Sequence, residues 1–216
     1  MLRQSIVLST ALSVCLVCFP GYVATAQSTA VGVTGGINRS TVLAGAEDTE
    51  SVLARIGFHA GGVLSIQSTG PLGFQFGANY HLKGFELETD DPDVTGGLRL
   101  AYFEVPILGV ATIPTGSVRP FLFGGPAFGF LLTCDVIATT QAGSASADCA
   151  TGGITTTSFD AGVMFGGGLS AGTRPAIGVD VGYTLGLLNI DDTPGLASEI
   201  KNRDLFASLR ILFPIH

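Results

Sequence analysis

Hydrophobic and polar side chains alternate strictly between Leu72 and Lys83. The even-numbered positions carry Leu, Phe, Ala and Tyr side chains, whereas the odd-numbered positions carry Gly, Gln, Asn, His and Lys. Because successive side chains of a β-strand point to opposite faces, this period of two predicts a strand with unlike environments on its two sides. In a soluble sandwich the apolar face would cover a core, whereas in a membrane barrel it would contact lipid.

The same alternation recurs in eight segments of the chain. They are approximately 30–38, 53–67, 72–87, 97–113, 118–133, 158–172, 175–189 and 202–214. The segment 118–133 is apolar on both faces, so its orientation is not predicted. Three connections are short and rich in turn-forming residues (68–71, 114–117 and 172–175), and four are long (39–51, 88–96, 134–157 and 190–201). Outer-membrane barrels combine short periplasmic turns with long extracellular loops in this way.

The composition also favours a membrane barrel. The chain has 31 glycines, only 12% charged residues and a mean hydropathy of +0.50, yet no apolar run of about 18 residues follows the N-terminus. Since only helices and closed barrels satisfy all backbone polar groups in hydrocarbon, a membrane protein without spanning helices must be a barrel. We therefore predict an all-β, eight-stranded, antiparallel up-and-down transmembrane β-barrel with a lumen filled by side chains.

The N-terminus predicts export. Arg3 precedes an apolar run over 6–19, and an A-x-A cleavage motif ends at Ala26. We expect a signal peptide over 1–26, cleavage between Ala26 and Gln27, one barrel domain over 27–216, and insertion into the bacterial outer membrane. An N-terminal membrane anchor is the less favoured alternative, because the apolar run is short and ends at Pro20.

Cleavage would remove two of the four cysteines and leave Cys134 and Cys149. An even pair in an exported chain predicts a disulfide. In the chain-entropy model, closing a loop of about 15 residues stabilises the fold by about 3 kcal/mol.

Hairpin geometry predicts which inward-facing side chains are neighbours. If the turn at 68–71 pairs Gln67 with Gly73, then His59 lies opposite His81 on the luminal face. Two imidazole rings would therefore be cross-strand neighbours.

The same counting places Lys83 opposite Gly57, and Glu104 on the next strand at a similar height. Across the last hairpin it places Asp180 opposite Arg210, as a buried ion pair. The predicted luminal polar cluster is His59, His81, Lys83, Glu104, Asp180 and Arg210.

We interpret this cluster as a structural plug, because a charge buried without a partner is costly. The alternative is a histidine and carboxylate site for acid-base chemistry or metal binding. No serine nucleophile is recognisable beside a histidine, and the motifs G-x-S-x-G and H-E-x-x-H are absent. We therefore predict no catalytic residue, cofactor or metal. The acidic run Asp90 to Asp93 lacks the ligand spacing of a calcium loop and is interpreted as a solvated loop.

Four runs of the chain resemble the PorT-like family of outer-membrane β-barrel proteins, which is similar to the eight-stranded OmpA and OmpX barrels. The runs are 32–38 (GVTGGIN), 57–61 (GFHAG), 102–108 (YFEVPIL) and 119–126 (RPFLFGGP). The resemblance covers nearly the whole mature chain and implies a link to secretion or envelope assembly. The chain departs from such barrels at its end, where Phe213 is followed by Pro214, Ile215 and His216 instead of closing the sequence.

Together these features predict a non-enzymatic barrel with a structural, adhesive or interaction role. The expected partners are outer-membrane lipid, lipopolysaccharide and the barrel assembly machinery, and the expected state is a monomer. The acidic net charge of −7 and the lack of a basic cluster argue against nucleic acid. Three alternatives stay open: an enzyme acting on lipid, a narrow channel, and a soluble lipocalin-like carrier.

Overall fold

The alternating segments form nine strands in the computed structural model, which describes residues 26–43, 52–88, 93–190 and 200–215. The strands are β1 (Ala26–Leu43), β2 (Val52–Ser68), β3 (Leu72–Glu88), β4 (Val94–Thr112), β5 (Val118–Thr140), β6 (Gly143–Asp148), β7 (Phe159–Ala171), β8 (Ala176–Gly186) and β9 (Lys201–Ile215). No helix long and apolar enough to cross a membrane occurs among these described residues.

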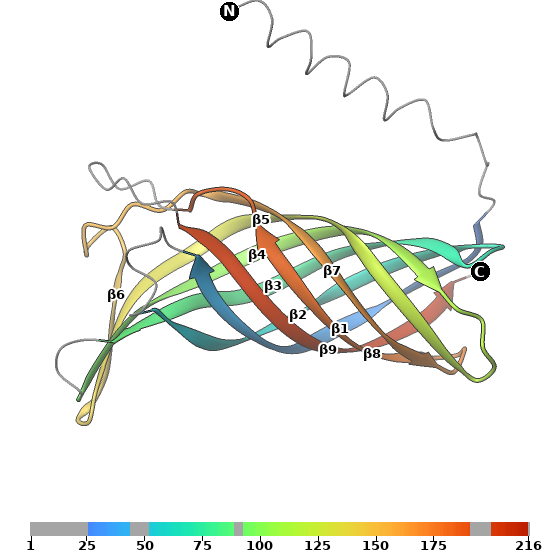
Figure 1. The fold of residues 1–216 in the computed structure, drawn as a ribbon, viewed down its shortest axis with the longest axis horizontal. Helices are drawn as coiled ribbons and strands as arrows, with labels where there is room; N and C mark the ends of the chain where they lie inside the picture. The colour runs from blue at the N-terminus through green and yellow to red at the C-terminus, as the bar shows by residue number, and fades with distance from the viewer. Residues whose placement is uncertain (1–25, 44–51, 89–92, 191–199, 216) are drawn as a thin grey trace, which may run out of the picture.

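Eight of the nine strands close into a ring (Figure 1). Every pairing in the ring is antiparallel, and the ladder between β4 and β5 closes the ring. Three short turns and the end of β9 lie at one end, which we call the turn end. The strand ends that the long connections join lie at the other, the loop end (Figure 1). The predicted eight-stranded up-and-down barrel is therefore confirmed.

Apolar side chains cover the outside of the ring, and polar side chains fill the inside. Val33 is 58% exposed and Phe58 is 50% exposed, whereas His81 and Glu104 are 2% exposed. This reverses the arrangement of a soluble protein, and it is the arrangement expected of a barrel surrounded by lipid.

The orientation of β5, which the sequence did not predict, is decided by glycines on β7. Phe121 lies opposite Gly168 and Phe123 opposite Gly166, and both phenylalanines are buried in the lumen. A Cβ atom added to Gly166 would lie 2.5 Å from the Phe123 ring, so only glycine leaves room for it. Leu122, between the two phenylalanines, is 65% exposed on the outer face.

The loop end differs from the prediction in one respect. We expected a loop over 134–157, but β5 continues to Thr140 and forms a hairpin with β6 beyond the ring (Figure 1). The ladder between β4 and β5 shifts register next to Tyr102, which pairs with Leu131 while its neighbour Ala101 pairs with Thr133. This bulge reverses the inside-outside alternation of β5 and brings Cys134 to the luminal side.

Several predictions concern residues outside the described ranges. They include the signal segment 1–25 and, in the acidic run interpreted as a solvated loop, Asp90 and Asp91. The predicted cleavage position between Ala26 and Gln27 falls at the first residues of β1.

Candidate functional site

The middle of the lumen holds a charge-balanced cluster centred on His81. Its Nδ1 atom lies 3.1 Å from Glu104 Oε1, and its Nε2 atom lies 3.1 Å from Asp204 Oδ2. The contact with Glu104 has hydrogen-bond geometry, whereas the contact with Asp204 is an ion-pair distance. A carboxylate only accepts hydrogen bonds, so Nδ1 of His81 carries the hydrogen that is shared with Glu104. Lys83 Nζ forms an ion pair with the second oxygen of Glu104. A lysine and a histidine thus face two carboxylates in a buried site.

His59 stands beside this cluster. It lies directly opposite His81 in the ladder between β2 and β3, with 5.2 Å between the ring centroids. The predicted pairing of Gly57 with Lys83 was wrong, because that ladder is interrupted between Ala54 and His59. Lys83 nevertheless points inward, since its position on β3 has the same parity as His81.

Asp180 and Arg210 form a second ion pair nearer the turn end. Their predicted direct opposition was wrong by two residues: Arg210 lies opposite Gly178, and Asp180 lies opposite Ser208. The Arg210 guanidinium reaches diagonally across the ladder, so that its Nε lies 3.3 Å from Asp180 Oδ2.

The predicted cluster did not include the carboxylates of Asp204 and Asp160, which also lie buried in the lumen. Asn38 Nδ2 donates to Asp204 Oδ1 at 2.9 Å, and the Ser40 hydroxyl donates to the same oxygen. Asn202 Nδ2 donates to Asp160 Oδ2 at 2.7 Å. Their numbering could have revealed two of these residues. The predicted luminal positions of the last strand are even-numbered (Phe206, Ser208 and Arg210), and Asp204 and Asn202 continue this series towards the loop end.

The structure also brings together a serine and a histidine that the sequence keeps far apart. Ser208 Oγ and His59 Nε2 lie 2.9 Å apart, although 149 positions separate them. We recognised no serine nucleophile beside a histidine in the sequence, because only closure of the ring brings these two strands close together. The adjoining cavity measures about 50 Å³, which is room for a few water molecules. A lipid or peptide substrate does not fit there.

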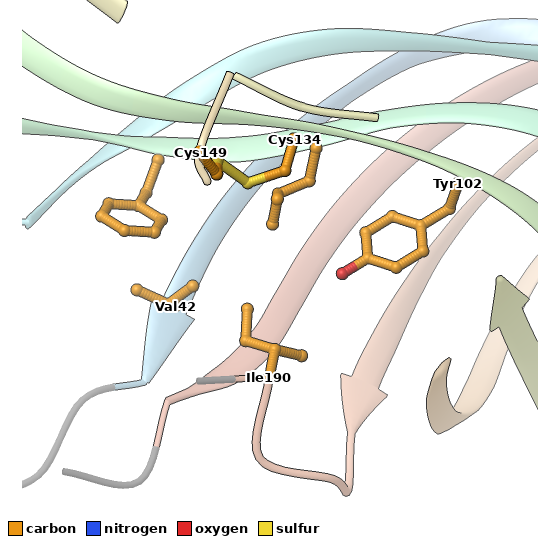
Figure 2. Close-up of a cluster of buried hydrophobic side chains, with 7 residues drawn as sticks. Val42, Tyr102, Cys134, Cys149 and Ile190 are labelled. Carbon is orange, nitrogen blue, oxygen red and sulfur yellow. A yellow bond between two sulfur atoms is a disulfide. The ribbon is translucent and has the colours of Figure 1, made fainter. Parts of the chain in front are cut away.

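A hydrophobic cap packs inside the loop end of the barrel (Figure 2). Its buried members are Val42, Phe85, Leu100, Tyr102, Cys134, Cys149 and Ile190. The predicted disulfide between Cys134 and Cys149 is confirmed, with a Cα–Cα distance of 5.4 Å. It ties the segment that follows β6 back onto β5 and thereby fixes the cap over the polar cluster.

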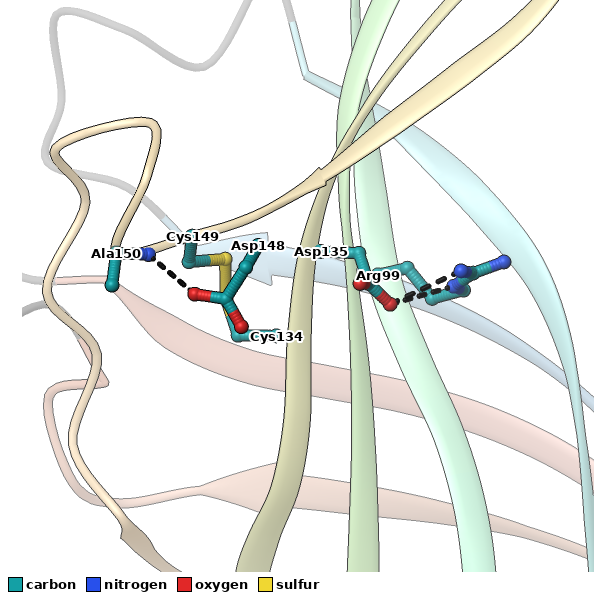
Figure 3. The surroundings of a disulfide bond; sticks show 6 residues. All are labelled: Arg99, Cys134, Asp135, Asp148, Cys149 and Ala150. Carbon is teal, nitrogen blue, oxygen red and sulfur yellow. Dashed lines mark hydrogen bonds and ion pairs between the residues drawn. A yellow bond between two sulfur atoms is a disulfide. The ribbon is translucent and has the colours of Figure 1, made fainter.

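Two polar contacts flank the disulfide (Figure 3). Arg99 Nε and Nη2 donate to Asp135 Oδ2 at 3.2 and 3.1 Å, which links β4 to β5 at the base of the hairpin. Asp148 Oδ1 accepts a hydrogen bond from the Ala150 backbone N–H at 2.9 Å, which fixes the turn after β6. Within the described part of the chain, no group of three His, Cys, Asp or Glu side chains is arranged to hold a metal ion.

Solved structures with a similar fold are outer-membrane proteins. OprG from Pseudomonas aeruginosa is 10% identical, with a TM-score of 0.50 over 88% of this chain and 96% of OprG. Neisserial surface protein A is 12% identical, with a TM-score of 0.45 over 84% and 97% of the two chains. Ail, the attachment invasion locus protein of Yersinia pestis, is 14% identical, with a TM-score of 0.40 over 85% and 99%.

At these identities the likeness concerns the fold alone. A sequence comparison with curated proteins found no match. Residues 25–192, in contrast, match the sequence family described as Outer membrane protein beta-barrel domain. This match covers most of the chain and agrees with the apolar outer surface of the ring. The chain therefore belongs to this family of bacterial outer-membrane β-barrel proteins.

Proposed function

We propose that this protein is a non-enzymatic interaction protein that presents an extracellular β-sheet on a plugged outer-membrane barrel. The observation that carries the proposal is the hairpin of β5 and β6. It stands beyond the ring at the loop end, which is the extracellular end of a barrel with this topology (Figure 1).

The extracellular sheet is built on the ends of two barrel strands. Residues 94–101 of β4 pair with 133–140 of β5, and residues 135–140 of β5 pair with β6 on their other side. Among the described strands, β6 pairs with β5 alone, and all six of its residues are exposed. The disulfide and the ion pair between Arg99 and Asp135 fix the base of this sheet.

The outer edge of β6 suits the addition of a further strand. An edge strand presents a row of backbone N–H and C=O groups to an incoming extended segment. Natural edges are commonly protected by lysine, proline or a bulge, but β6 has the sequence GSASAD, with small uncharged residues until Asp148. This edge is therefore accessible to the backbone of a partner.

The interior of the barrel supports a non-enzymatic role. The pair formed by His59 and Ser208 adjoins a cavity of only about 50 Å³, and the hydrophobic cap lies between it and the outside. A lipid-modifying enzyme or a channel would need this cap to move. The soluble-carrier alternative is abandoned, because the chain belongs to a family of outer-membrane barrels.

Further partners follow from the location and are part of the same proposal. Outer-membrane lipid and lipopolysaccharide would surround the apolar band of the monomer, and the barrel assembly machinery would insert it. A link to secretion or envelope assembly rests on the resemblance to the PorT-like family alone.

The proposal is tested by charging the β6 edge. Cells that display the protein are compared with cells that display the double variant Ser144→Lys/Ser146→Lys, in assays of autoaggregation and of adhesion to immobilised extracellular proteins. We expect both activities to fall to the level of vector-only cells, because lysines on an edge strand oppose pairing. A matched control, Thr115→Lys/Ser117→Lys, adds the same charge at the turn end. Equal adhesion by the protein, both variants and vector-only cells would refute the proposal.

A further inference from the structure

The turn end of the lumen opens into a second, larger cavity of about 570 Å³, which we call the vestibule. Gln75, Phe121 and Arg210 form its inner wall, and Arg119 and Arg174 are among the residues that line its mouth. Gln75 and Arg210 also line the small central cavity, so they separate the vestibule from the polar plug. In a barrel with short periplasmic turns, the vestibule faces the periplasm.

The charged side chains of the vestibule are all positive. Its lining includes Arg119, Arg174 and Arg210 but no carboxylate. The sequence explains this: no Asp or Glu occurs within 27–46, 62–85, 105–134, 161–179 or 205–216, and these ranges contain every residue of the lining. The acidic residues that the structure describes lie in the plug and towards the loop end. The periplasmic opening of the vestibule is therefore basic, although the net charge of the whole chain is −7.

The charge of Arg210 is paired with a carboxylate, and its guanidinium makes three contacts. Its Nε lies 3.3 Å from Asp180, its Nη1 donates to Gln75, and its guanidinium carbon lies 4.2 Å from the centroid of the Phe121 ring. These contacts hold the guanidinium on three sides. Arg210 thus provides a rigid polar base for the vestibule.

The charges of Arg119 and Arg174 are available to a ligand. Arg119 Nη2 donates to the Gly172 carbonyl at 2.7 Å, which orients the guanidinium but leaves its charge without a counter-ion. Most of its five N–H donors are not used by that single bond. Arg174 is exposed in the turn between β7 and β8. Among the described residues, neither arginine forms an ion pair.

We propose that the vestibule is a periplasmic binding site for a phosphate-bearing anion, held between Arg119 and Arg174. Guanidinium groups bind phosphate in a bidentate manner, and a phosphate with up to two charges matches two arginines better than a single carboxylate does. A cavity lined by one sign of charge concentrates counter-ions. The apolar walls formed by Val110, Ile177 and Leu212 would contact an organic group attached to the phosphate.

The test uses the full protein purified from outer membranes and placed in phosphatidylcholine nanodiscs. Inorganic pyrophosphate is titrated calorimetrically, and a heat-shift gel confirms that each variant is folded. We expect saturable binding that weakens as salt rises, and at least a tenfold loss of affinity in Arg119→Gln/Arg174→Gln. Arg99→Gln, which removes an arginine at the opposite end, should bind like the unaltered protein. No binding at millimolar pyrophosphate, or equal binding by both variants, would overturn the proposal.

Two sources of the phosphate are distinguished by a second measurement. The protein and the double variant are delipidated after incubation with phosphatidylglycerol, and retained lipid is counted by native mass spectrometry. Retention that depends on Arg119 and Arg174 assigns the site to a headgroup of the inner leaflet. Pyrophosphate binding without such retention assigns it to a soluble periplasmic phosphate ester.

Discussion

Replacing Glu104 by glutamine should destabilise the barrel strongly. Glutamine preserves the shape of the side chain but removes the negative charge that pairs with Lys83 and His81. The side chains of Lys83 and Glu104 are only 4% and 2% exposed, so water cannot replace the lost partner. The change therefore leaves a lysine charge buried with a neutral amide in place of its anion.

The expected loss is about 3 to 5 kcal/mol of unfolding free energy, the typical cost of breaking a buried pair from one side. A pair on the same barrel that is only partly buried gives the scale. Arg55 and Glu86 lie 3.4 Å apart with side chains 21% and 38% exposed, so Glu86→Gln should cost at most about 1 kcal/mol.

Unfolding is measured by urea titration in phosphatidylcholine vesicles, with the heat-shift gel as the readout of folded barrel. Lys83→Met and the double variant Lys83→Met/Glu104→Gln complete a double-mutant cycle. The double variant should lose less than the sum of the single losses, because it removes both charges together.

Two results would refute this account of the plug. If Glu104→Gln were no more costly than Glu86→Gln, the lumen would have to be hydrated. If the two substitutions of the cycle were additive, Lys83 and Glu104 would not be energetically coupled in the folded barrel.

Three further predictions follow from the same structure. Gly166→Val should prevent folding, or the variant should unfold at much lower urea than Gly62→Val, as measured by the urea titration. A Cβ atom at 166 would lie 2.5 Å from the Phe123 ring, whereas one at the outward position 62 would lie 3.9 Å from its nearest neighbour, the Gly32 carbonyl oxygen. Reduction, or the variant Cys134→Ala/Cys149→Ala, should lower stability by up to about 3 kcal/mol, and an equal midpoint with and without dithiothreitol would contradict this. In planar bilayers the barrel should show no steady conductance, because its central cavity holds only about 50 Å³; stable open channels would show that the plug moves.

Local periodicity was sufficient to predict the barrel. The alternation from Leu72 to Lys83 sets both the strand and its two faces, since side-chain direction in a strand depends only on parity. The same parity placed His59, His81 and Glu104 in the lumen. A tight turn such as 68–71 also fixes register, so the pairing of His59 with His81 could be counted from the turn.

Where the connection is long, the sequence alone does not set register or partners. The last hairpin is shifted by two residues from the predicted pairing, so Arg210 contacts Asp180 diagonally. The contacts of His81 with Asp204 and of His59 with Ser208 join strands at opposite ends of the chain, and only closure of the ring brings them together. Parity also fails at a bulge, which is why the luminal position of Cys134 required the structure.

The sequence by itself determined the strands, their two faces and the class of barrel, because these depend on local alternation and on the need to satisfy backbone groups in a membrane. The tertiary structure alone decided which charges share the plug, which strand carries a free extracellular edge, and that three arginines surround one periplasmic cavity. Those properties depend on distances between strands far apart in the sequence. Such distances are set by ring closure and packing.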